Sequence, residues 1–336
     1  MKNGLKLGIA LGSGSARGWS HIGVLRALKR YGIEPDIVAG TSIGALVGAC
    51  YAGGTLDELE RWVTSLGWRD VVSLLDLKLG GGLIEGRKVF QFFEQHMSEL
   101  TFEQLQKPFA AVATDLETGR EIWLQHGHLA EAVRASLSIP GLFRPYRSQA
   151  GRILVDGGLV NPVPVALCRA MGADLVIAVN LNSEIVGKHL RNSRKASTEF
   201  QPQNGSADGD ESDKPAAPAD AVRSGESDFM RRLTQLFADE GSDNVSSSAG
   251  SNGGSNDRNQ PMPGLMEVIA SSINIMQDRV TRSRMAGDPP DLVLTPRLSH
   301  LGLMEFYRAA EAIAAGEQTV EHALPALRTL LGLDET

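Results

Sequence analysis

The stretch DIVAGTSIGALVGACYAG, residues 36–53, places a short apolar run directly before a run of small residues. The apolar run predicts a buried strand, and the small residues after Ser42 predict a helix that packs closely against that strand. A serine on a sharp turn from strand to helix is the arrangement of a nucleophile elbow. Ser42 is therefore a candidate nucleophile, and Gly40 and Gly44 leave space for the close backbone crossings that such a turn needs.

Strand-like and helix-like patterns alternate along most of the chain. Predicted strands cover 5–12, 36–42, 152–158, 174–181 and 291–298, and two more meet at Glu117–Gly119 inside 109–127. Predicted helices cover 19–32, 43–53, 55–66, 86–98, a stretch from the Thr101/Gln104 capping box, 129–138, 163–172, a long segment from Leu265, and two helices at the C-terminal end. Strands separated by helices indicate an α/β fold of three layers, with a mostly parallel central sheet between two layers of helices.

The composition is that of an ordinary globular protein. Hydrophobic residues make up 42% of the 336 and charged residues 22%. The net charge of -7 argues against a nucleic-acid partner, because phosphate binding needs a basic face. Cys50 and Cys168 belong to no CxxC or His/Cys cluster, so we expect neither a disulfide framework nor a metal site. The sequence predicts no transmembrane helix and no signal peptide, and hence a cytoplasmic protein.

The composition changes in the second half of the chain. Sixteen of the twenty residues in 241–260 are Ser, Gly, Asn or Asp, which bury too little apolar surface to fold. We therefore expect 186–262 to be a disordered insertion within one domain, whose first part is 5–185 and whose last part is 263–333. Inside the insertion, 227–240 places its apolar residues on one side of a helix. Docking on the rest of the protein and contact with a membrane surface are both open for this helix.

A second candidate for catalysis follows a later strand. Asp156 leaves the hydrophobic run ILV into the turn made by Gly157 and Gly158. A serine hydroxyl needs a base to become a good nucleophile. Burial among apolar residues raises the pKa of a carboxyl group toward the range that is useful for proton transfer. An aspartate that only caps the turn is the other interpretation.

The segment LGSGSARG, residues 11–18, here called the glycine segment, follows the first strand and opens a helix. Such a position favours anion binding by backbone N–H groups. It lacks the Gly-Lys-Ser/Thr end of a P-loop, and its three glycines miss the spacing of a dinucleotide fingerprint. An acidic residue about 20 positions on (Glu34 or Asp36) keeps the dinucleotide interpretation open. The alternative is an oxyanion hole opposite the candidate nucleophile, built by amides near Gly14 and Ser15.

Together these segments resemble the patatin-like phospholipases. That family has a Gly-rich segment ending in Arg/Lys-Gly, a Gly-x-Ser-x-Gly elbow and an Asp-Gly-Gly/Ala motif, and here GSGSARG, GTSIG and DGG occur in that order. SLSIPGLFRP (136–145) is similar to the family's stretch before its aspartate. The similarity covers about 5–182, resumes at 263–330, and is closest to the bacterial branch related to the catalytic domain of neuropathy target esterase. Ser13 and Ser15 depart from the pattern, since many members have glycine there.

The resemblance implies a Ser–Asp dyad that works through an acyl-enzyme, without a metal or an organic cofactor. Ser42 would attack the ester carbonyl, and Asp156 would accept its proton. Arg17 would either orient a substrate phosphate or pair with a carboxylate. The oxyanion would be held by the amides of Gly14, Ser15 and Ile43, and the motif glycines are Gly12, Gly18, Gly40, Gly44, Gly157 and Gly158.

The same resemblance implies a phospholipid or lysophospholipid substrate, and with it peripheral contact with the inner membrane surface. Two other interpretations stay open. A Ser-Asp-His triad of the α/β-hydrolase type would use His300, which follows the last predicted strand as the order Ser, Asp, His requires. A binding or regulatory protein that keeps the fold without catalysis would instead use the insertion to recruit protein partners, whose identity is unknown.

Overall fold

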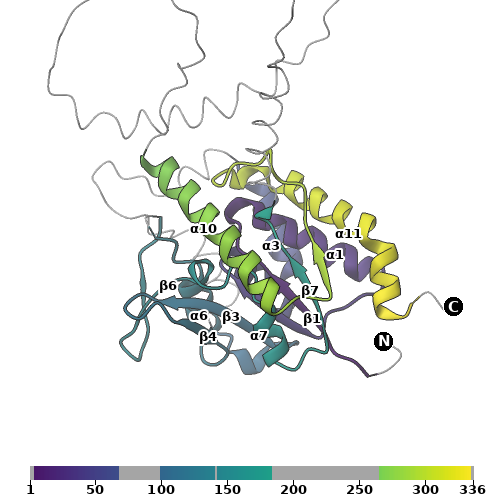
Figure 1. Ribbon diagram of the computed structural model, residues 1–336, viewed down its shortest axis with the longest axis horizontal. Coiled ribbons are helices and arrows are strands. Elements are labelled where there is room, and N and C mark those ends of the chain that lie inside the picture. The colour runs from purple at the N-terminus through teal and green to yellow at the C-terminus, as the bar shows by residue number, and fades with distance from the viewer. Residues whose placement is uncertain (1–3, 68–98, 141, 184–264, 334–336) are drawn as a thin grey trace, which may run out of the picture.

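The apolar runs of the sequence come together in one sheet of eight strands (Figure 1). The computed structural model describes residues 4–67, 99–140, 142–183 and 265–333. The strands are β1 (Leu7–Leu11), β2 (Ile37–Thr41), β3 (Phe109–Asp115), β4 (Glu121–Leu124), β5 (Tyr146–Arg147), β6 (Ile153–Asp156), β7 (Leu175–Val179) and β8 (Leu292–Leu294). Their order is β5-β6-β3-β2-β1-β7-β8, and β4 also pairs with β3.

The centre of the sheet is parallel. Strand β1 pairs in parallel with β2 and β7, β2 pairs with β3, and β7 pairs with β8. Strands β4 and β6 run antiparallel to β3, and β5 runs antiparallel to β6. The mostly parallel sheet predicted from the alternation of strands and helices is therefore confirmed, with an antiparallel part on the side of β3.

Strand β3 brings the ends of two other strands together. Its residues 111–114 pair with β4 along one edge. Along the other edge, Thr41 at the end of β2 lies opposite Val112, and Asp156 at the end of β6 lies opposite the next residue, Ala113. Because β6 runs against β2, the carboxyl ends of these two strands point toward each other and meet beside β3.

Helices cover both faces of the sheet, which confirms the three-layer α/β/α architecture (Figure 1). The helices are α1 (Ser20–Arg30), α2 (Ile43–Gly53), α3 (Leu56–Ser65), α6 (Leu129–Ser136), α7 (Val165–Ala170), α10 (Leu265–Gly287) and α11 (Ala309–Leu331), and the 3-10 turns are η1 (Ser15–Trp19), η2 (Phe102–Gln104), η3 (Gly157–Leu159) and η4 (Phe306–Arg308). Alternate side chains of β1 point to opposite faces. Ile9 and Leu11 belong to the core shared with α1, α2 and α11, whereas Ala10 belongs to the core shared with α7.

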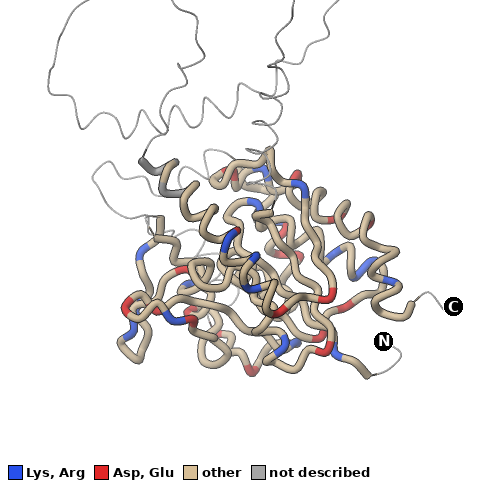
Figure 2. The backbone as a smooth tube through the Cα atoms, in the orientation of Figure 1, with Lys and Arg blue, Asp and Glu red and all other residues tan. Residues whose placement is uncertain are grey.

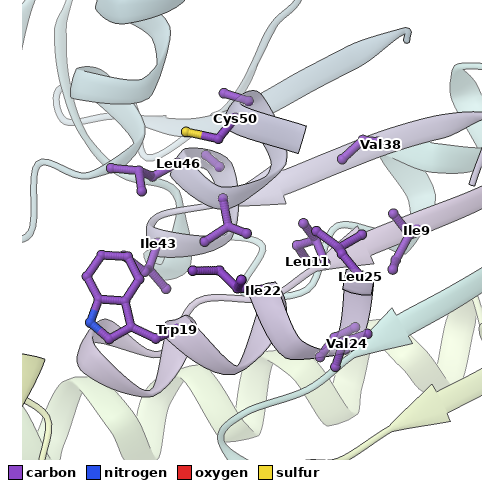
Figure 3. Close-up of a cluster of buried hydrophobic side chains, with 14 of the residues drawn as sticks. Ile9, Leu11, Trp19, Ile22, Val24, Leu25, Val38, Ile43, Leu46 and Cys50 are labelled. Atoms are coloured by element: carbon purple, nitrogen blue, oxygen red, sulfur yellow. The ribbon is translucent and has the colours of Figure 1, made fainter. Parts of the chain in front are cut away.

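The larger core lies between the sheet and helices α1 and α2 (Figure 3). Ile22 of α1 and Leu46 of α2 are fully buried and belong to the same cluster as Ile9 of β1. Trp19 ends this cluster, where its ring lies edge-on to Trp62 and its indole N–H donates to the Phe306 carbonyl at 3.2 Å. Full burial of one such aliphatic side chain contributes roughly 1.5–3 kcal/mol, so this core holds the turn between β2 and α2 firmly in place.

Helices α1 and α11 cross in backbone contact. A Cβ atom on Gly23 of α1 would lie 1.9 Å from the carbonyl oxygen of Ile313, and a Cβ on Gly316 of α11 would lie 2.0 Å from the carbonyl oxygen of Ser20. Each glycine therefore provides the space that the other helix's backbone fills. This crossing fixes α11, from the C-terminal end of the chain, on the helix that follows the glycine segment.

Two helix predictions were wrong. The Thr101/Gln104 capping box forms, with the Thr101 N–H donating to Gln104 Oε1 at 2.9 Å, but only the single turn η2 follows it. Pro108 disfavours helical geometry at the residue before it, and β3 begins at the residue after it. At the C-terminal end, one described helix, α11, stands where two were predicted, because it runs unbroken from Ala309 to Leu331 after the single turn η4.

Some predictions fall outside the described residues. These are the helix at 86–98, the insertion 186–262 and its amphipathic segment 227–240. Within the described residues, Lys, Arg, Asp and Glu are interspersed along the backbone rather than separated by sign (Figure 2).

Both cysteines are buried in the core. Neither forms a disulfide, and burial raises the pKa of each thiol to about 12. Thiolate, the reactive form, is therefore scarce near neutral pH. Cys50 and Cys168 act as small core side chains.

Candidate active site

Ser42 occupies a strained turn between β2 and α2. Its backbone has φ 57° and ψ -124°, a left-handed conformation that a residue with a Cβ rarely adopts. The turn is tight: a Cβ on Gly40 would lie 2.4 Å from the carbonyl oxygen of Gly44, and a Cβ on Gly44 would lie 2.2 Å from that of Leu11. The N–H of Ser42 donates to Ser136 Oγ at 2.8 Å. This local structure is that of a nucleophile elbow.

Asp156 lies against the serine hydroxyl. Ser42 Oγ donates a hydrogen bond to Asp156 Oδ2, and the Gly158 N–H donates to Asp156 Oδ1 at 2.6 Å. Both side chains are buried, each residue being 2% exposed. A Cβ on Gly157 would lie 2.2 Å from the Val112 carbonyl oxygen, so only glycine allows the chain to turn here directly after the strand. The structure thus brings the two predicted catalytic side chains together.

Burial raises the pKa of Asp156 to about 6. The hydrogen bonds from Ser42 and Gly158 act in the opposite direction, because they stabilise the ionised carboxylate. The backbone of Asp156 is fixed as well: its N–H donates to the Ser138 carbonyl at 2.9 Å, and its carbonyl accepts from Thr114 Oγ1 at 2.8 Å. A rigidly held carboxylate with this pKa can accept a proton near neutral pH.

The glycine segment is anchored to three other parts of the chain. The Gly12 N–H donates to the Val179 carbonyl at 3.1 Å, and the Ser13 N–H donates to the Pro162 carbonyl at 2.8 Å. The Ala16 N–H donates to the Leu303 carbonyl at 3.0 Å. Strand β7, the chain after η3 and the C-terminal region therefore all determine where this segment lies.

Three amides near Ser42 stay free. Among the described residues, the N–H groups of Gly14, Ser15 and Ile43 have no hydrogen-bond partner. Ser15 adopts φ 53°, so the turn accepts a Cβ where many family members have glycine. A Cβ on Gly18 would lie 2.1 Å from the Ile43 side chain, which shows how closely this segment packs on the start of α2. Free amides and a helix N-terminus favour developing negative charge.

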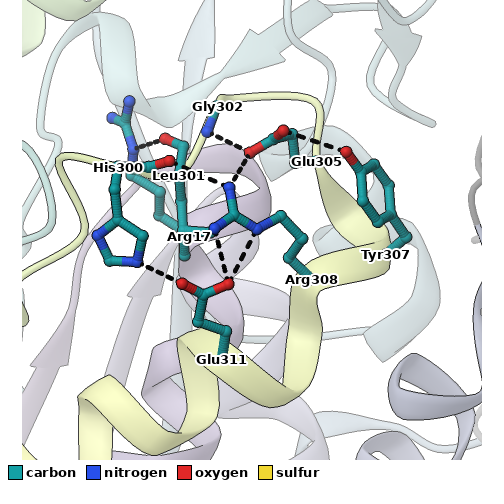
Figure 4. A network of polar contacts seen from close by, with 8 residues as sticks. All are labelled: Arg17, His300, Leu301, Gly302, Glu305, Tyr307, Arg308 and Glu311. Atoms are coloured by element: carbon teal, nitrogen blue, oxygen red, sulfur yellow. Dashed lines mark hydrogen bonds and ion pairs between the residues drawn. The ribbon is translucent and has the colours of Figure 1, made fainter. Parts of the chain in front are cut away.

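The Arg17 side chain reaches a polar network of the C-terminal region (Figure 4). Its Nε donates to the Leu301 carbonyl at 3.0 Å, while its Nη1 has no partner among the described residues. Burial lowers the pKa of Arg17 to about 10, and the charge of Glu305 opposes that shift. Glu305 itself accepts from the Gly302 N–H at 2.8 Å and from Arg308 Nη1 at 2.7 Å. In this arrangement Arg17 holds the 301–308 segment to the glycine segment.

No histidine is bonded to the serine or the aspartate within the described residues. His300 Nε2 lies 2.7 Å from Glu311 Oε1 on the surface. His21 is fully buried with Nε2 2.8 Å from the Gly12 carbonyl oxygen, and burial lowers its pKa to about 4, which keeps the ring neutral. Ser42 and Asp156 contact each other directly, whereas a triad would require a histidine between them.

Sequence reasoning missed two residues that hold the site. Ser136, on α6, accepts the N–H of Ser42, and its only signal was its place at the start of the SLSIPGLFRP stretch. Gln277, on α10, bonds Ser13 Oγ at 3.0 Å, and no local pattern identified it. Long-range contacts of this kind carry no periodicity or motif in the sequence.

Comparison with known proteins identifies the family. A model described as "Patatin-like phospholipase" matches residues 9–169, which include the glycine segment, the serine turn and the Asp-Gly-Gly turn. An uncharacterized NTE family protein of Mycobacterium tuberculosis is 35% identical over 331 residues, covering 96% of this chain and 92% of that protein. The chain belongs to the patatin-like phospholipase family. Membership implies lipid acyl hydrolase activity, that is, hydrolysis of ester bonds.

Other patatin-like proteins are similar over a shorter region. "Patatin-like phospholipase domain-containing protein 6" of Homo sapiens is 34% identical over 192 residues, which cover 54% of this chain and 14% of that protein. A crystal structure of VipD from Legionella pneumophila aligns with 98% of this chain and 79% of that one, at 12% identity. Its TM-score of 0.36 is too low to support any conclusion.

The described residues contain neither a metal-binding cluster nor a membrane-spanning helix. Within 4–67, 99–140, 142–183 and 265–333, no group of three or more His, Cys, Asp or Glu side chains could hold a metal ion. In the same ranges no helix is both long and apolar enough to cross a bilayer.

Proposed function

We propose that this patatin-like protein hydrolyses acyl esters of phospholipids or lysophospholipids through an acyl-enzyme on Ser42, with Asp156 as its only proton-transfer partner. The observation that carries the proposal is the hydrogen bond from Ser42 Oγ to the buried carboxylate of Asp156, formed at the N-terminus of α2. Substrates of this class reside in bilayers, so contact with a membrane surface belongs to the same proposal.

In the first step Ser42 Oγ attacks the ester carbonyl carbon while its proton passes to Asp156 Oδ2. The carbonyl oxygen becomes an oxyanion, and the free amides of Gly14, Ser15 and Ile43 are the donors available for it. In comparable sites one such donor contributes roughly 2.7–4 kcal/mol to the transition state. The C–O bond to the alcohol then breaks, and the alcohol leaves with the proton that Asp156 held.

In the second step a water molecule attacks the acyl group on Ser42 and gives one proton to Asp156. The bond to Ser42 Oγ breaks, and the proton returns from Asp156 to the serine. The fatty acid is released and the starting state is restored. One carboxylate can serve both steps because its raised pKa, about 6, makes it able to accept and to return a proton near neutral pH.

Labelling of Ser42 by a fluorophosphonate probe should depend on the ionisation of Asp156. Only the ionised carboxylate can accept the serine proton, so the rate should fall as the pH drops below about 6. We expect labelling at pH 5 to be about tenfold slower than at pH 7. The measurement is the pseudo-first-order rate of probe incorporation, with hydrolysis of a short-chain nitrophenyl ester as a second readout. A purely regulatory protein would not react at Ser42, and a pH-independent rate would contradict the role of Asp156.

Replacing Asp156 with asparagine should abolish labelling and yet stabilise the fold at high pH. Because the pKa of Asp156 is higher in the folded than in the unfolded chain, its ionisation lowers stability as the pH rises from about 4 through about 6. Asparagine cannot ionise, so at pH 8 the free energy of unfolding of the variant should exceed that of the wild type by about 3 kcal/mol. Urea unfolding at pH 8 and pH 4 measures this difference, which should shrink at pH 4. A less stable variant at pH 8 would contradict the desolvated state of the carboxylate.

A further inference from the structure

Helix α10 turns a polar face toward the protein. Asn274, Gln277, Asp278 and Thr281 are all 9% exposed or less and recur at helical spacing, whereas the apolar residues Ile275 and Met276 are 54% and 51% exposed. This is the reverse of an ordinary surface helix, which buries its apolar side. Buried polar side chains need partners, so the face has a specific polar surface to contact.

The oxygen end of the Gln277 side chain holds the glycine segment. Its Oε1 accepts from Ser13 Oγ at 3.0 Å and from Asn182 Nδ2 at 3.2 Å. Asn182 Nδ2 also reaches the Ser13 carbonyl oxygen at 3.4 Å. Ser13 and Asn182 are 1% and 0% exposed, so these contacts are sheltered from water. Ser13 lies directly before Gly14, whose amide is one of the proposed oxyanion donors.

The nitrogen end of the same amide lies beside the Asp-Gly-Gly turn. A Cβ on Gly158 would be 2.4 Å from Gln277 Nε2 and 2.8 Å from Asp156 Oδ1. The two atoms are therefore within about 5 Å of each other, on the same side of Gly158. The nitrogen end of the Gln277 amide thus lies beside the turn that holds the catalytic carboxylate.

We propose that Gln277 is a positioning residue that sets the distance between the oxyanion amides and the Ser42–Asp156 pair. This inference rests on the proposed function. Its side chain touches the glycine segment at one end and lies beside the Asp-Gly-Gly turn at the other. Small displacements of such groups cost large factors in rate, because oxyanion donors act only at short range.

Ser13 supplies the hydroxyl that links the glycine segment to Gln277 on α10. A glycine at this position would offer no hydroxyl to Gln277. The serine therefore replaces flexibility with a buried hydrogen bond between the glycine segment and α10. Ser13 and Gln277 should behave as a coupled pair, so the effects of their substitutions on the rate should not be additive.

The experiment compares Gln277→Met with Asn274→Leu on the full-length chain. Both substitutions remove a buried amide from the same face of α10, but among the described residues Asn274 makes no hydrogen bond to either catalytic segment. We expect Gln277→Met to slow fluorophosphonate labelling and kcat for a nitrophenyl ester about tenfold or more, with little change in KM. Asn274→Leu should label at close to the wild-type rate. Equal losses in both variants would show general packing and overturn the proposal, as would wild-type labelling by Gln277→Met.

Two further variants keep the proposal falsifiable if Gln277→Met does not fold. Ser13→Gly leaves Gln277 in place and should slow labelling, while adding Gln277→Met to it should cost little more. Gln277→Glu keeps the oxygen for Ser13 but puts a second carboxylate beside Asp156, so the acid limb of the pH–rate profile should move up by about one unit. An unshifted limb, or unchanged labelling by Ser13→Gly, would overturn the positioning role alone. Absence of labelling in the wild type would instead overturn the proposed function, and this inference with it.

Discussion

Replacing Ser42 with alanine should reduce ester hydrolysis by about four orders of magnitude or more while leaving the fold intact, because no acyl-enzyme can form without the hydroxyl. The turn keeps its backbone contacts, including the Ser42 N–H bond to Ser136 Oγ, which alanine preserves. The measurement is fatty-acid release from diacyl phospholipid vesicles and from lysophospholipid, together with nitrophenyl ester turnover. The lipid class that loses product in the variant identifies the natural type of substrate.

Two controls separate the dyad from its alternatives. Ser65→Ala removes an exposed hydroxyl at the end of α3 and should leave turnover unchanged. His300→Ala should also be without effect on turnover, since His300 contacts Glu311 and not the dyad. Loss of labelling in His300→Ala would revive the triad, and residual turnover in Ser42→Ala would mean that another group is the nucleophile.

Replacing Gly23 with alanine should strongly lower the free energy of unfolding, because the added methyl group has no space. The new Cβ would lie 1.9 Å from the carbonyl oxygen of Ile313, and this oxygen belongs to the backbone of α11 and cannot rotate away. The two helices must separate, which opens the core around Ile22, the residue directly before Gly23. We expect a loss of about 3 kcal/mol in the free energy of unfolding, measured by urea denaturation.

Gly287→Ala is the matched control. Gly287 ends α10, its φ is not left-handed, and a Cβ there would meet nothing within 4 Å. Alanine should therefore be neutral or slightly stabilising at this position. Equal stability of the Gly23→Ala and Gly287→Ala proteins would contradict the close crossing of α1 and α11.

The parts of the site that a sequence can predict are those set by neighbouring residues. The helix predicted over 43–53 has the same bounds in the structure, because the small residues after Ser42 pack only as a helix and Gly54 ends it in a left-handed conformation. The hairpin of β3 and β4 likewise follows from its turn residues and its alternating pattern. In each case one segment contains both the signal and the contacts that decide the structure.

The meeting of Ser42 and Asp156 depends on a long-range register and could not be derived from local pattern. It requires β2 to end opposite Val112 and β6 to end opposite Ala113 on the same edge of β3. The order of the three motifs, known from the family resemblance, pointed to the pair without explaining its geometry. The role of Gln277 is still harder to predict from the sequence, since its bond to Ser13 joins residues 264 positions apart.

The capping box and the C-terminal helix show how tertiary context overrides a correct local signal. The Thr101 box forms as its residues predict, but Pro108 stops the helix within one turn. Helix α11 contains Pro325 and nevertheless continues to Leu331, where Leu327 and Leu331 are buried in the core. Propensity is a weak guide wherever such contacts are available.

Because both cysteine thiols are buried, an introduced surface cysteine can be labelled selectively in this chain. Cys50 and Cys168 are the only two in the sequence, and neither presents a thiolate near neutral pH. A cysteine introduced at Met276, on the outer side of α10, would therefore be the single site for a maleimide dye. Such a dye would report on movement of α10 during turnover, in a protein whose serine can be tagged separately by phosphonate chemistry.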